Sequence, residues 1–452
     1  MDWKTFLKKN KLEEGQLVKV TGEKQEQTGN IIPSSGKDKE ILRLKLSSGY
    51  NIGIKISEKL KVEKLEGSKK VSKGKKTETK QKPDLPKIAI LHTGGTIASR
   101  VDYRSGAVYS SFNPNDLLAM FPELMDIANF SSKLISNMWS DDLRFTHFEA
   151  IGKAVKKAYE DGAEGIILGM GTDNMAVASA AMAFVLEKCP IPVIFVGAQR
   201  SSDRGSSDAA MNLICAATFI TKTDFAGVAI CMHENTSDEK CVILPACKTR
   251  KLHSSRRDAF RTVNDIPIAL VDYKSKKIEF LKKDYERKNK DKMIIKPKFE
   301  DKTGLLKIHI NMFPEQFEFF TKGKYKGLVI EGTGLGHTPG HNPDGTLKIH
   351  EKFFPAIKKL IDSGCVVVMT TTTLFGRVHM HVYDKGTDLV ALGVIPGQDM
   401  LPETAFVKLA WLLGNYKQKE VQGLIAKNLR GEISASIPYE EKFAEGIIPS
   451  AQ

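Results

Sequence analysis

Residues 88–99 read Ile-Ala-Ile-Leu-His-Thr-Gly-Gly-Thr-Ile-Ala-Ser, a short apolar run that ends in a Gly-rich polar turn. A second run of this kind, Gly-Ile-Ile-Leu-Gly-Met-Gly-Thr-Asp, occupies residues 165–173. Continuous apolar runs of this length are typical of buried strands in a parallel sheet. Because ligands of open α/β sheets bind just beyond the carboxyl ends of the strands, one cleft would receive Thr96, Thr172 and Asp173.

These three side chains suit a hydroxyl nucleophile that has its own activating partners. The simpler interpretation is that residues 93–96, Thr-Gly-Gly-Thr, are only a strand-to-helix turn in which Thr96 is the N-cap. The recurrence of the pattern after a second apolar run favours a site. Neither turn is a phosphate-binding P-loop, because the chain contains no G-x-x-x-x-G-K-[ST] pattern.

Length and composition limit the class of protein. A chain of 452 residues is too long for one compact domain, and we expect two or three domains. No run of 18 apolar residues predicts a membrane span, and the amino terminus does not resemble a secretory signal. Six scattered cysteines without a C-x-x-C pattern indicate reduced thiols in a cytoplasmic protein, with no disulfide framework and no zinc site.

The positive charge is concentrated in two segments. Residues 1–86 hold 21 Lys and Arg against 12 Asp and Glu, and residues 271–300 hold 11 against 6, so together they account for the whole net charge of +14. A basic appendage on a neutral body indicates an anionic macromolecular partner, and nucleic acid is favoured over a membrane. The alternative is that these lysines only keep the protein soluble.

Sequence patterning divides the chain into five parts. They are a small basic β-barrel-like domain, a flexible basic linker, a larger α/β domain, a charged connector and a smaller α/β domain: residues 1–66, 67–86, 87–270, 271–300 and 301–452. Alternation of strand and helix patterns in the two α/β domains predicts βαβ units and parallel sheets. The strand candidates there are residues 87–92, 165–169, 192–197, 227–231, 305–310, 327–331 and 366–370.

Two further groups could complete the chemistry. The segment Lys251-Leu-His-Ser-Ser-Arg-Arg-Asp-Ala-Phe260 follows the fourth strand candidate, and its lysine, if brought beside Thr172 and Asp173, could accept the threonine proton. Tyr109 lies in a Gly-Ala-Val-Tyr-Ser segment that we interpret as a mobile loop, where its hydroxyl could relay a proton and exclude water. Taken singly, both residues are more often ordinary surface groups.

From about residue 87 to 420, the motifs and their order resemble the bacterial-type L-asparaginase family of amidohydrolases. The motifs are Thr-Gly-Gly-Thr-Ile-Ala at 93–98, Gly-Thr-Asp at 171–173, Val-Gly-Ala-Gln-Arg-Ser-Ser-Asp at 196–203, and the Lys251 segment. The resemblance implies an α/β fold, with an asparaginase-like two-domain parallel-sheet core preceded by the small β-barrel-like domain.

The same resemblance implies a role for each candidate catalytic residue. Thr96 would be the nucleophile that attacks the side-chain amide of the substrate, and the loop tyrosine Tyr109 would assist it. Thr172, Asp173 and Lys251 would form the second catalytic triad. Asp173 would also bind the α-amino group of the substrate.

The resemblance is looser for the residues that hold the substrate. A serine–acid pair matching Ser140 and Asp141 would help to bind the α-amino and carboxylate groups. His337 is the candidate for a residue that closes the site of a neighbouring subunit, although its segment can also be only a strand-end turn. The chain departs from the family's usual pattern at Asn174, where a threonine is usual, and Met170 is a second residue that can retune the pocket.

No cofactor or metal is expected on this chain. His379 and His381 lie two residues apart on an expected strand, which could suggest a metal, but the pattern holds no third ligand. The Gly-rich segment around Gly334 is not a dinucleotide fingerprint, because its third glycine is misplaced.

Ordinary asparaginases lack the basic leader, and the whole arrangement is similar to the asparaginase-like subunits of archaeal tRNA-dependent amidotransferases. The segment 393–403, Gly-Val-Ile-Pro-Gly-Gln-Asp-Met-Leu-Pro-Glu, shares this similarity. It implies release of ammonia from glutamine or asparagine for a tRNA-binding partner subunit of the E type. That partner would bind Glu-tRNA(Gln) and activate it with ATP and Mg²⁺. A homodimer, and a heterotetramer with the partner, are also implied.

Two other functions stay open at this point. The first is a free-standing L-asparaginase with an added basic domain, which the basic leader disfavours. The second is a non-catalytic α/β module that binds a nucleotide through its Gly-rich turns. The intact set of Thr96, Thr172, Asp173 and Lys251 disfavours this second function.

Overall fold

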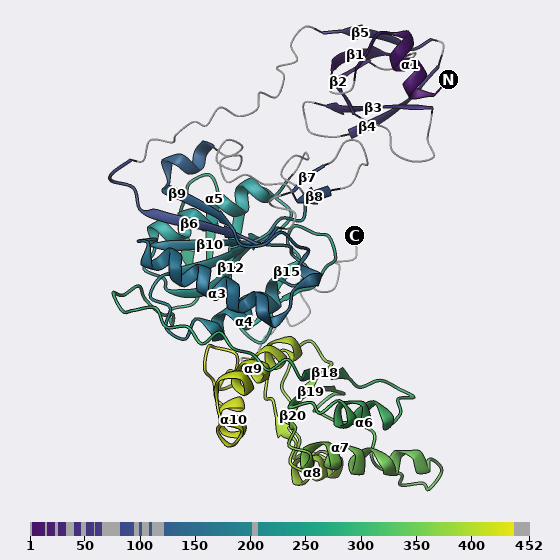
Figure 1. Ribbon diagram of the computed structural model, residues 1–452, viewed down its shortest axis with the longest axis vertical. Helices are drawn as coiled ribbons and strands as arrows, with labels where there is room; N and C mark the ends of the chain where they lie inside the picture. The colour runs from purple at the N-terminus through teal and green to yellow at the C-terminus, as the bar shows by residue number, and fades with distance from the viewer. Residues whose placement is uncertain are drawn as a thin grey trace.

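The computed structural model contains three folded parts (Figure 1). It describes residues 2–13, 16–22, 26–32, 40–46, 51–57, 59–65, 82–94, 99–101, 108–110, 122–200 and 207–437. Among these residues, no helix is long and apolar enough to cross a membrane. The six cysteines are all free thiols.

The first part is a small antiparallel sheet with one helix. Its elements are α1 (Trp3–Lys9), β1 (Leu17–Thr21), β2 (Glu26–Ile32), β3 (Ile41–Leu46), β4 (Asn51–Lys55) and β5 (Lys61–Lys64). The strand order is β4-β3-β2-β1-β5, so β5 returns to pair with β1. Trp3 and Phe6 of α1 pack with Val18 and Leu44 in its core. The β-rich domain was predicted from sequence, whereas α1 and β5 were not.

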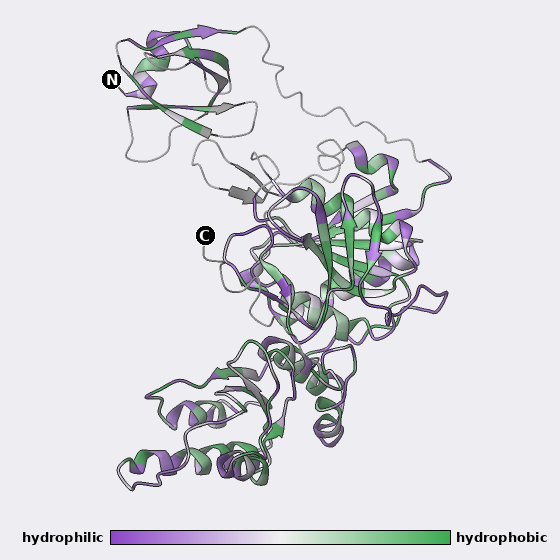
Figure 2. Ribbon diagram, turned by 180° about the vertical axis from the view of Figure 1, so that it is seen from behind, coloured by the Kyte–Doolittle hydropathy of each residue, from purple (hydrophilic) through white to green (hydrophobic). Residues whose placement is uncertain are grey.

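The second part is built on an eight-stranded sheet whose order is β17-β16-β13-β12-β11-β10-β6-β9. The strands are β6 (Lys87–His92), β9 (Asn129–Leu134), β10 (Gly165–Gly169), β11 (Pro192–Val196), β12 (Gly227–His233), β13 (Lys240–Pro245), β16 (Ala269–Asp272) and β17 (Ile278–Phe280). The central strands are parallel and buried on both faces, which explains their continuous apolar sequences. Figure 2 shows this concentration of hydrophobic residues in the sheet.

Alternate side chains of the central strands point into two separate cores. Ile88 and Ile90 of β6 pack on the face covered by α5 (Ala209–Lys222). Ala89 and Leu91 pack on the other face, beneath α3 (Phe145–Glu160) and α4 (Met175–Val185). Helices on both faces of a parallel sheet leave the carboxyl ends of the strands open for a site.

The sheet is mixed rather than wholly parallel, because β13, β16 and β17 are antiparallel. A short turn joins β12 to β13, and a connection of that length permits only antiparallel pairing. The sheet therefore continues to Phe280, into the segment that we expected to be a charged connector from residue 271.

The third part is a four-stranded parallel sheet in the order β18-β19-β20-β21. Its strands are β18 (Thr303–Lys307), β19 (Gly327–Gly332), β20 (Val366–Thr371) and β21 (Ile395–Pro396). Its helices are α6 (Glu315–Lys322), α7 (Phe353–Asp362), α8 (Asp384–Ala391), α9 (Pro402–Asn415) and α10 (Gln418–Ile425). Immediately before α7 the chain forms the 3₁₀ turn η4 (Lys348–Lys352).

Helix α9 joins the two α/β parts, because it packs against both α4 and the four-stranded sheet (Figure 1). The rings of Phe184 on α4 and Trp411 on α9 stack with centroids 5.5 Å apart. The Trp411 indole also donates a hydrogen bond of 2.8 Å to the carbonyl of Lys296. One aromatic residue of α9 thus anchors the C-terminal sheet to the larger domain.

Candidate active site

The two Gly-rich turns lie side by side, because β6 and β10 are adjacent parallel strands. His92 pairs with Gly169 at the last step of their register, and the Thr93 amide donates to the Gly169 carbonyl at 3.0 Å. The turn after β6 also passes close to the segment before η3 (Ser140–Asp142). Gly94 has φ +99°, and a Cβ there would lie 2.8 Å from the carbonyl oxygen of Met138.

The centre of the site is a hydrogen-bonded group of Thr172, Asp173 and Lys251. The Lys251 ammonium donates to Thr172 Oγ1 at 2.9 Å and to Asp173 Oδ1 at 2.7 Å. The Lys251 side chain is 11% exposed, whereas that of Asp173 is 64% exposed. A lysine held in this way can exchange a proton with the threonine hydroxyl, and the outward carboxylate is free to meet a cationic substrate group.

A separate two-stranded hairpin presents Lys251 to this group. Strand β14 (Thr249–Lys251) pairs with β15 (Phe260–Thr262), and Lys251 lies opposite the fully buried Phe260. The connection between these strands is stiffened by Asp258, which accepts two hydrogen bonds of 2.8 Å from Arg256. These bonds hold the pKa of the Asp258 carboxyl below its usual value, so this pair stays charged at neutral pH.

Asn174 fixes the position of the serine–acid pair. The side-chain nitrogen Nδ2 of Asn174 donates to the Ser140 carbonyl at 3.1 Å and to Asp141 Oδ1 at 3.2 Å. Ser140 is buried and Asp141 is exposed. Gly171 allows this close approach, because a Cβ there would lie 3.1 Å from the Ser140 hydroxyl. The departure from the family's usual residue at 174 therefore places an amide between two candidate substrate-binding residues.

The structure describes the other candidate residues only in part. Thr96 lies outside the described residues. Tyr109 is described in its backbone alone, which lies on β8 (Val108–Ser110), paired with β7 (Ser99–Val101), rather than in an irregular loop. Arg100 is its partner across this short hairpin.

His337 belongs to the C-terminal sheet, just beyond β19. Its ring packs edge-on against Tyr383, with the two ring centroids 5.4 Å apart. Among the described residues, no contact joins His337 to the Thr172 group. Burial lowers the pKa of this imidazole, with a smaller effect from Lys385. The contacts within the described part of this chain therefore do not bring His337 to the site, and its role toward a neighbouring subunit stays a prediction.

The expectation that His379 and His381 lie on a strand was wrong. Residues 377–383 form turns without strand structure. Over the described parts of the chain, no cluster of three or more His, Cys, Asp or Glu residues could hold a metal ion.

A buried carboxylate shapes the turn after β11, where the motif beginning at residue 196 lies. Asp208 accepts hydrogen bonds from the backbone amides of Gln199 at 3.0 Å and Arg200 at 3.1 Å. Asn212 donates both to Asp208 at 3.2 Å and to the Gly197 carbonyl at 3.0 Å. The motif thus has a structural function in its described residues, and residues 201–206 lie outside them.

Comparison with known proteins defines the class of this fold. Residues 87–286 match the asparaginase N-terminal domain, and residues 302–424 match the glutaminase/asparaginase C-terminal domain. The structure superposes on the thermostable L-asparaginase of Thermococcus kodakarensis with a TM-score of 0.68 and 28% identity, covering 77% of this chain and 100% of that one. L-asparaginase I of Vibrio cholerae shares the fold with a TM-score of 0.66, 24% identity and coverage of 77% and 99%. The fold is therefore that of the asparaginase and glutaminase class.

The remaining part of the chain narrows the family. Residues 12–65 match the GatD N-terminal domain. The chain is 43% identical to the GatD subunit of the glutamyl-tRNA(Gln) amidotransferase of Pyrococcus furiosus over 441 residues, which cover 96% of this chain and 97% of that protein. The same subunit of Methanococcus maripaludis is 42% identical over 429 residues, with coverage of 94% and 99%. The chain belongs to the GatD family of glutamyl-tRNA(Gln) amidotransferase subunits.

Proposed function

We propose that this chain is the glutaminase subunit of a tRNA-dependent amidotransferase and releases ammonia from glutamine or asparagine. The observation that carries the proposal is the Lys251 ammonium within hydrogen-bond distance of both Thr172 and Asp173 at the carboxyl end of β10. The full-length similarity to GatD relatives, including the N-terminal domain, favours this function over a free-standing L-asparaginase.

In the proposed reaction, the Thr96 hydroxyl oxygen bonds to the side-chain amide carbon of glutamine. The carbon–nitrogen bond breaks, and the proton that Thr96 loses is the one that the leaving ammonia gains. Tyr109 assists the deprotonation, and Thr172 with Lys251 relays the proton. Water then cleaves the threonine ester through the same relay, which releases glutamate and restores the enzyme.

Substrate binding in this proposal uses the exposed carboxylates at the edge of the site. Asp173 accepts hydrogen bonds from the α-ammonium group, and Asp141 adds negative charge beside it. The Ser140 hydroxyl binds the α-carboxylate. His337 of a neighbouring copy closes the site, which makes a homodimer the smallest active form.

The proposed division of labour leaves ATP chemistry to another protein. The chain has no P-loop, so we assign ATP, Mg²⁺ and activation of Glu-tRNA(Gln) to a tRNA-binding partner subunit of the E type. Two copies of each subunit would form a heterotetramer in the cytoplasm. The basic leader and the basic segment 271–300 would attract the tRNA backbone without reading its sequence.

The test is glutamine hydrolysis by the purified chain carrying Thr96→Ala or Lys251→Met. We expect Thr96→Ala to abolish ammonia release and Lys251→Met to lower it by on the order of 10²–10⁴, because both groups act at the reacting bond. Lys277→Met, at an exposed lysine of the same larger domain, is the control and should keep the original rate. Wild-type turnover in either site variant would overturn the proposed function.

A further inference from the structure

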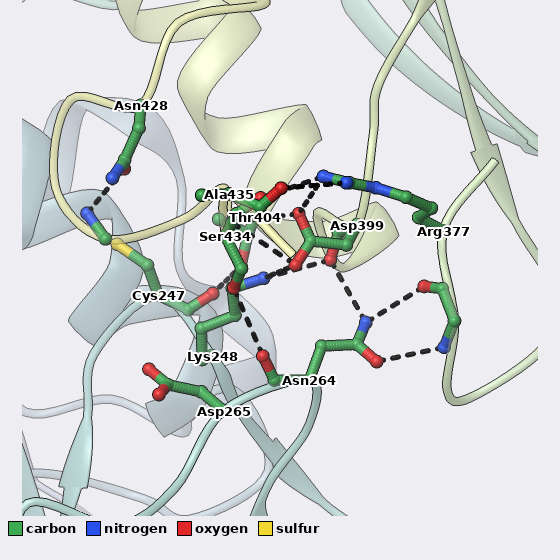
Figure 3. A network of polar contacts seen from close by, with 12 residues as sticks. Cys247, Lys248, Asn264, Asp265, Arg377, Asp399, Thr404, Asn428, Ser434 and Ala435 are labelled. Atoms are coloured by element: carbon green, nitrogen blue, oxygen red, sulfur yellow. Dashed lines mark hydrogen bonds and ion pairs between the residues drawn. The ribbon is translucent and has the colours of Figure 1, made fainter. Parts of the chain in front are cut away.

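The hairpin that carries Lys251 is held at its base by one residue of the C-terminal domain, Asp399 (Figure 3). Lys248, the residue before β14, donates to Asp399 Oδ2 at 2.6 Å and to its carbonyl at 3.2 Å. Asn264, two residues after β15, donates to the same carbonyl at 3.2 Å. Asp399 therefore binds both ends of the hairpin at once.

The ion pair at this base is well enclosed. The side chains of Lys248 and Asp399 are both 0% exposed. The second carboxylate oxygen accepts from the Ser434 amide at 3.0 Å, and Arg377 lies 3.6 Å away. The Asn264 side chain also forms two bonds with Gly376, at 2.9 and 3.0 Å. The bonds from Lys248 and Ser434 satisfy the Asp399 carboxylate in a place where water cannot reach it.

Neighbours of Asp399 hold the rest of β14. Thr404 donates to the Cys247 carbonyl at 3.0 Å, just before the strand. Glu403 accepts from Arg250 at 2.7 Å, and Arg250 directly precedes Lys251. Residues 399–404 thus contact the chain from Cys247 to Arg250, one residue short of the candidate catalytic lysine.

We propose that Asp399 and Glu403 are positioning residues, which set the β14–β15 hairpin so that Lys251 reaches Thr172 and Asp173. This inference rests on the proposed function, because it gives a purpose to residues 399–404 only if Lys251 takes part in the reaction. Lys248 lies three residues from Lys251, about 10 Å along an extended strand, so a shift at the base moves the ammonium directly. A displacement of about 1 Å in a catalytic group can cost on the order of 10²-fold in rate.

The chemistry of the pair favours positioning over stability. Buried ion pairs often stabilise a fold no better than apolar side chains of the same volume, because both charges lose their hydration. Their bonds are nevertheless directional, whereas the packing of the buried Phe260 against the core of the larger domain is not. The pair therefore adds to this hairpin a directional restraint that apolar packing alone does not supply.

Asp399→Asn in the full chain tests the inference, because it removes the charge and keeps the shape. We expect kcat for glutamine hydrolysis to fall about tenfold while KM changes less than twofold. The matched control is Lys408→Met, which breaks a buried pair of equal length, 2.6 Å and 0% exposed at both partners, that makes no hydrogen bond to the hairpin. It should lower Tm at least as much as Asp399→Asn and leave kcat within twofold.

The decisive measurement is the effect of Asp399→Asn in a Lys251→Met background. If Asp399 acts through Lys251, the second change causes no further loss, whereas an equal loss in both backgrounds means a general structural role and overturns the inference. If Asp399→Asn does not fold, Glu403→Gln provides the test, because the Arg250–Glu403 pair is only half-buried. An unchanged kcat in Glu403→Gln would then overturn the inference. Wild-type activity of Lys251→Met alone would instead refute the proposed function.

Discussion

Individual side chains around Thr172 divide into candidate reacting groups and groups that hold other residues in place. The position of Thr172 could be predicted from the sequence, because strand ends of a parallel sheet meet at one edge. Lys251 was found through its motif, since it lies on the separate β14–β15 hairpin. The contribution of Asn174 could not be predicted in this way. Its two hydrogen bonds depend on the 3₁₀ turn at Ser140, more than thirty residues earlier in the chain. Its unusual identity was the only signal in the sequence.

Asn174→Ala should weaken substrate binding more than it slows the reaction. The change removes the amide that orients Ser140 and Asp141, and one hydrogen bond of this kind is worth about 1 kcal/mol. We expect KM for glutamine to rise about three- to tenfold with kcat within twofold. Asn289→Ala, at an exposed asparagine on the connector, is the control, and an unchanged KM in Asn174→Ala would contradict the assigned function.

His92 should make stability depend on pH. Burial lowers the pKa of this imidazole to about 4, whereas in the unfolded chain it titrates near 6.5. Between these values the unfolded state binds more protons, so the free energy of unfolding falls as the pH drops from about 6.5 toward 4.

Urea unfolding at pH 7.5 and 4.5 measures this effect. Between pH 7.5 and 4.5, the free energy of unfolding of the original chain should fall by on the order of 1 kcal/mol more than that of His92→Gln, after allowance for solvent screening. The same pH dependence in both proteins would show that other groups cause it.

Helices and strands could be predicted where burial is complete. The strand candidates at 87–92, 165–169 and 192–197 match β6, β10 and β11 closely, because each strand has an apolar, buried central run. Strand β9 was missed because it lies at the sheet edge, where half of its side chains meet water and its sequence, Asn-Phe-Ser-Ser-Lys-Leu, is polar. Local sequence also cannot show that β13 continues the sheet in the antiparallel sense.

Gly94→Ala should damage the turn after β6 beyond the general cost of its backbone conformation. The residue has φ +99°, and the new methyl group would lie 2.8 Å from the Met138 carbonyl. Gly162 is a matched control, because it has φ +94° and no atom within 4 Å of an added Cβ.

Both alanine variants should carry the strain of a positive φ, which is on the order of 1–2 kcal/mol. Gly94→Ala should show a larger fall in Tm and should also lose glutaminase activity, because the turn leads directly to Thr96. Equal falls in Tm, with activity kept, would mean that Met138 yields without cost.

At the scale of the whole molecule, a pair of packed α/β domains is combined with a basic domain that has its own core. The domain pattern could be predicted from charge and periodicity, since these vary along the sequence. The ion pair that links the two α/β domains could not be predicted, because Lys248 and Asp399 are 151 residues apart. Asp399 lies in the segment 393–403 noted in the sequence, but that pattern does not show which residue it binds. Such pairs are determined by tertiary packing alone.

Deletion of residues 1–86 should separate the two proposed activities. Glutamine hydrolysis should stay close to the original rate, because the Thr172 group lies wholly within the α/β domains. Amidation of charged tRNA by the assembled complex should weaken, most strongly at low salt and less as salt screens the charges, if the basic domain attracts the tRNA backbone. Full amidation at every salt concentration would leave the domain only a structural or partner-docking function.

The late position of Asp399 in the chain has a consequence for biosynthesis. A ribosome that has made the first 300 residues has completed every strand of the eight-stranded sheet. The bonds from Asp399 to the base of the Lys251 hairpin nevertheless form only after residues 399–404 and Ser434 emerge. Nascent chains should therefore release ammonia at least about tenfold more slowly than the finished chain, which stalled ribosome complexes can show directly. An enzyme whose product is wasted without a consumer would reach its full rate only when its own synthesis is nearly finished.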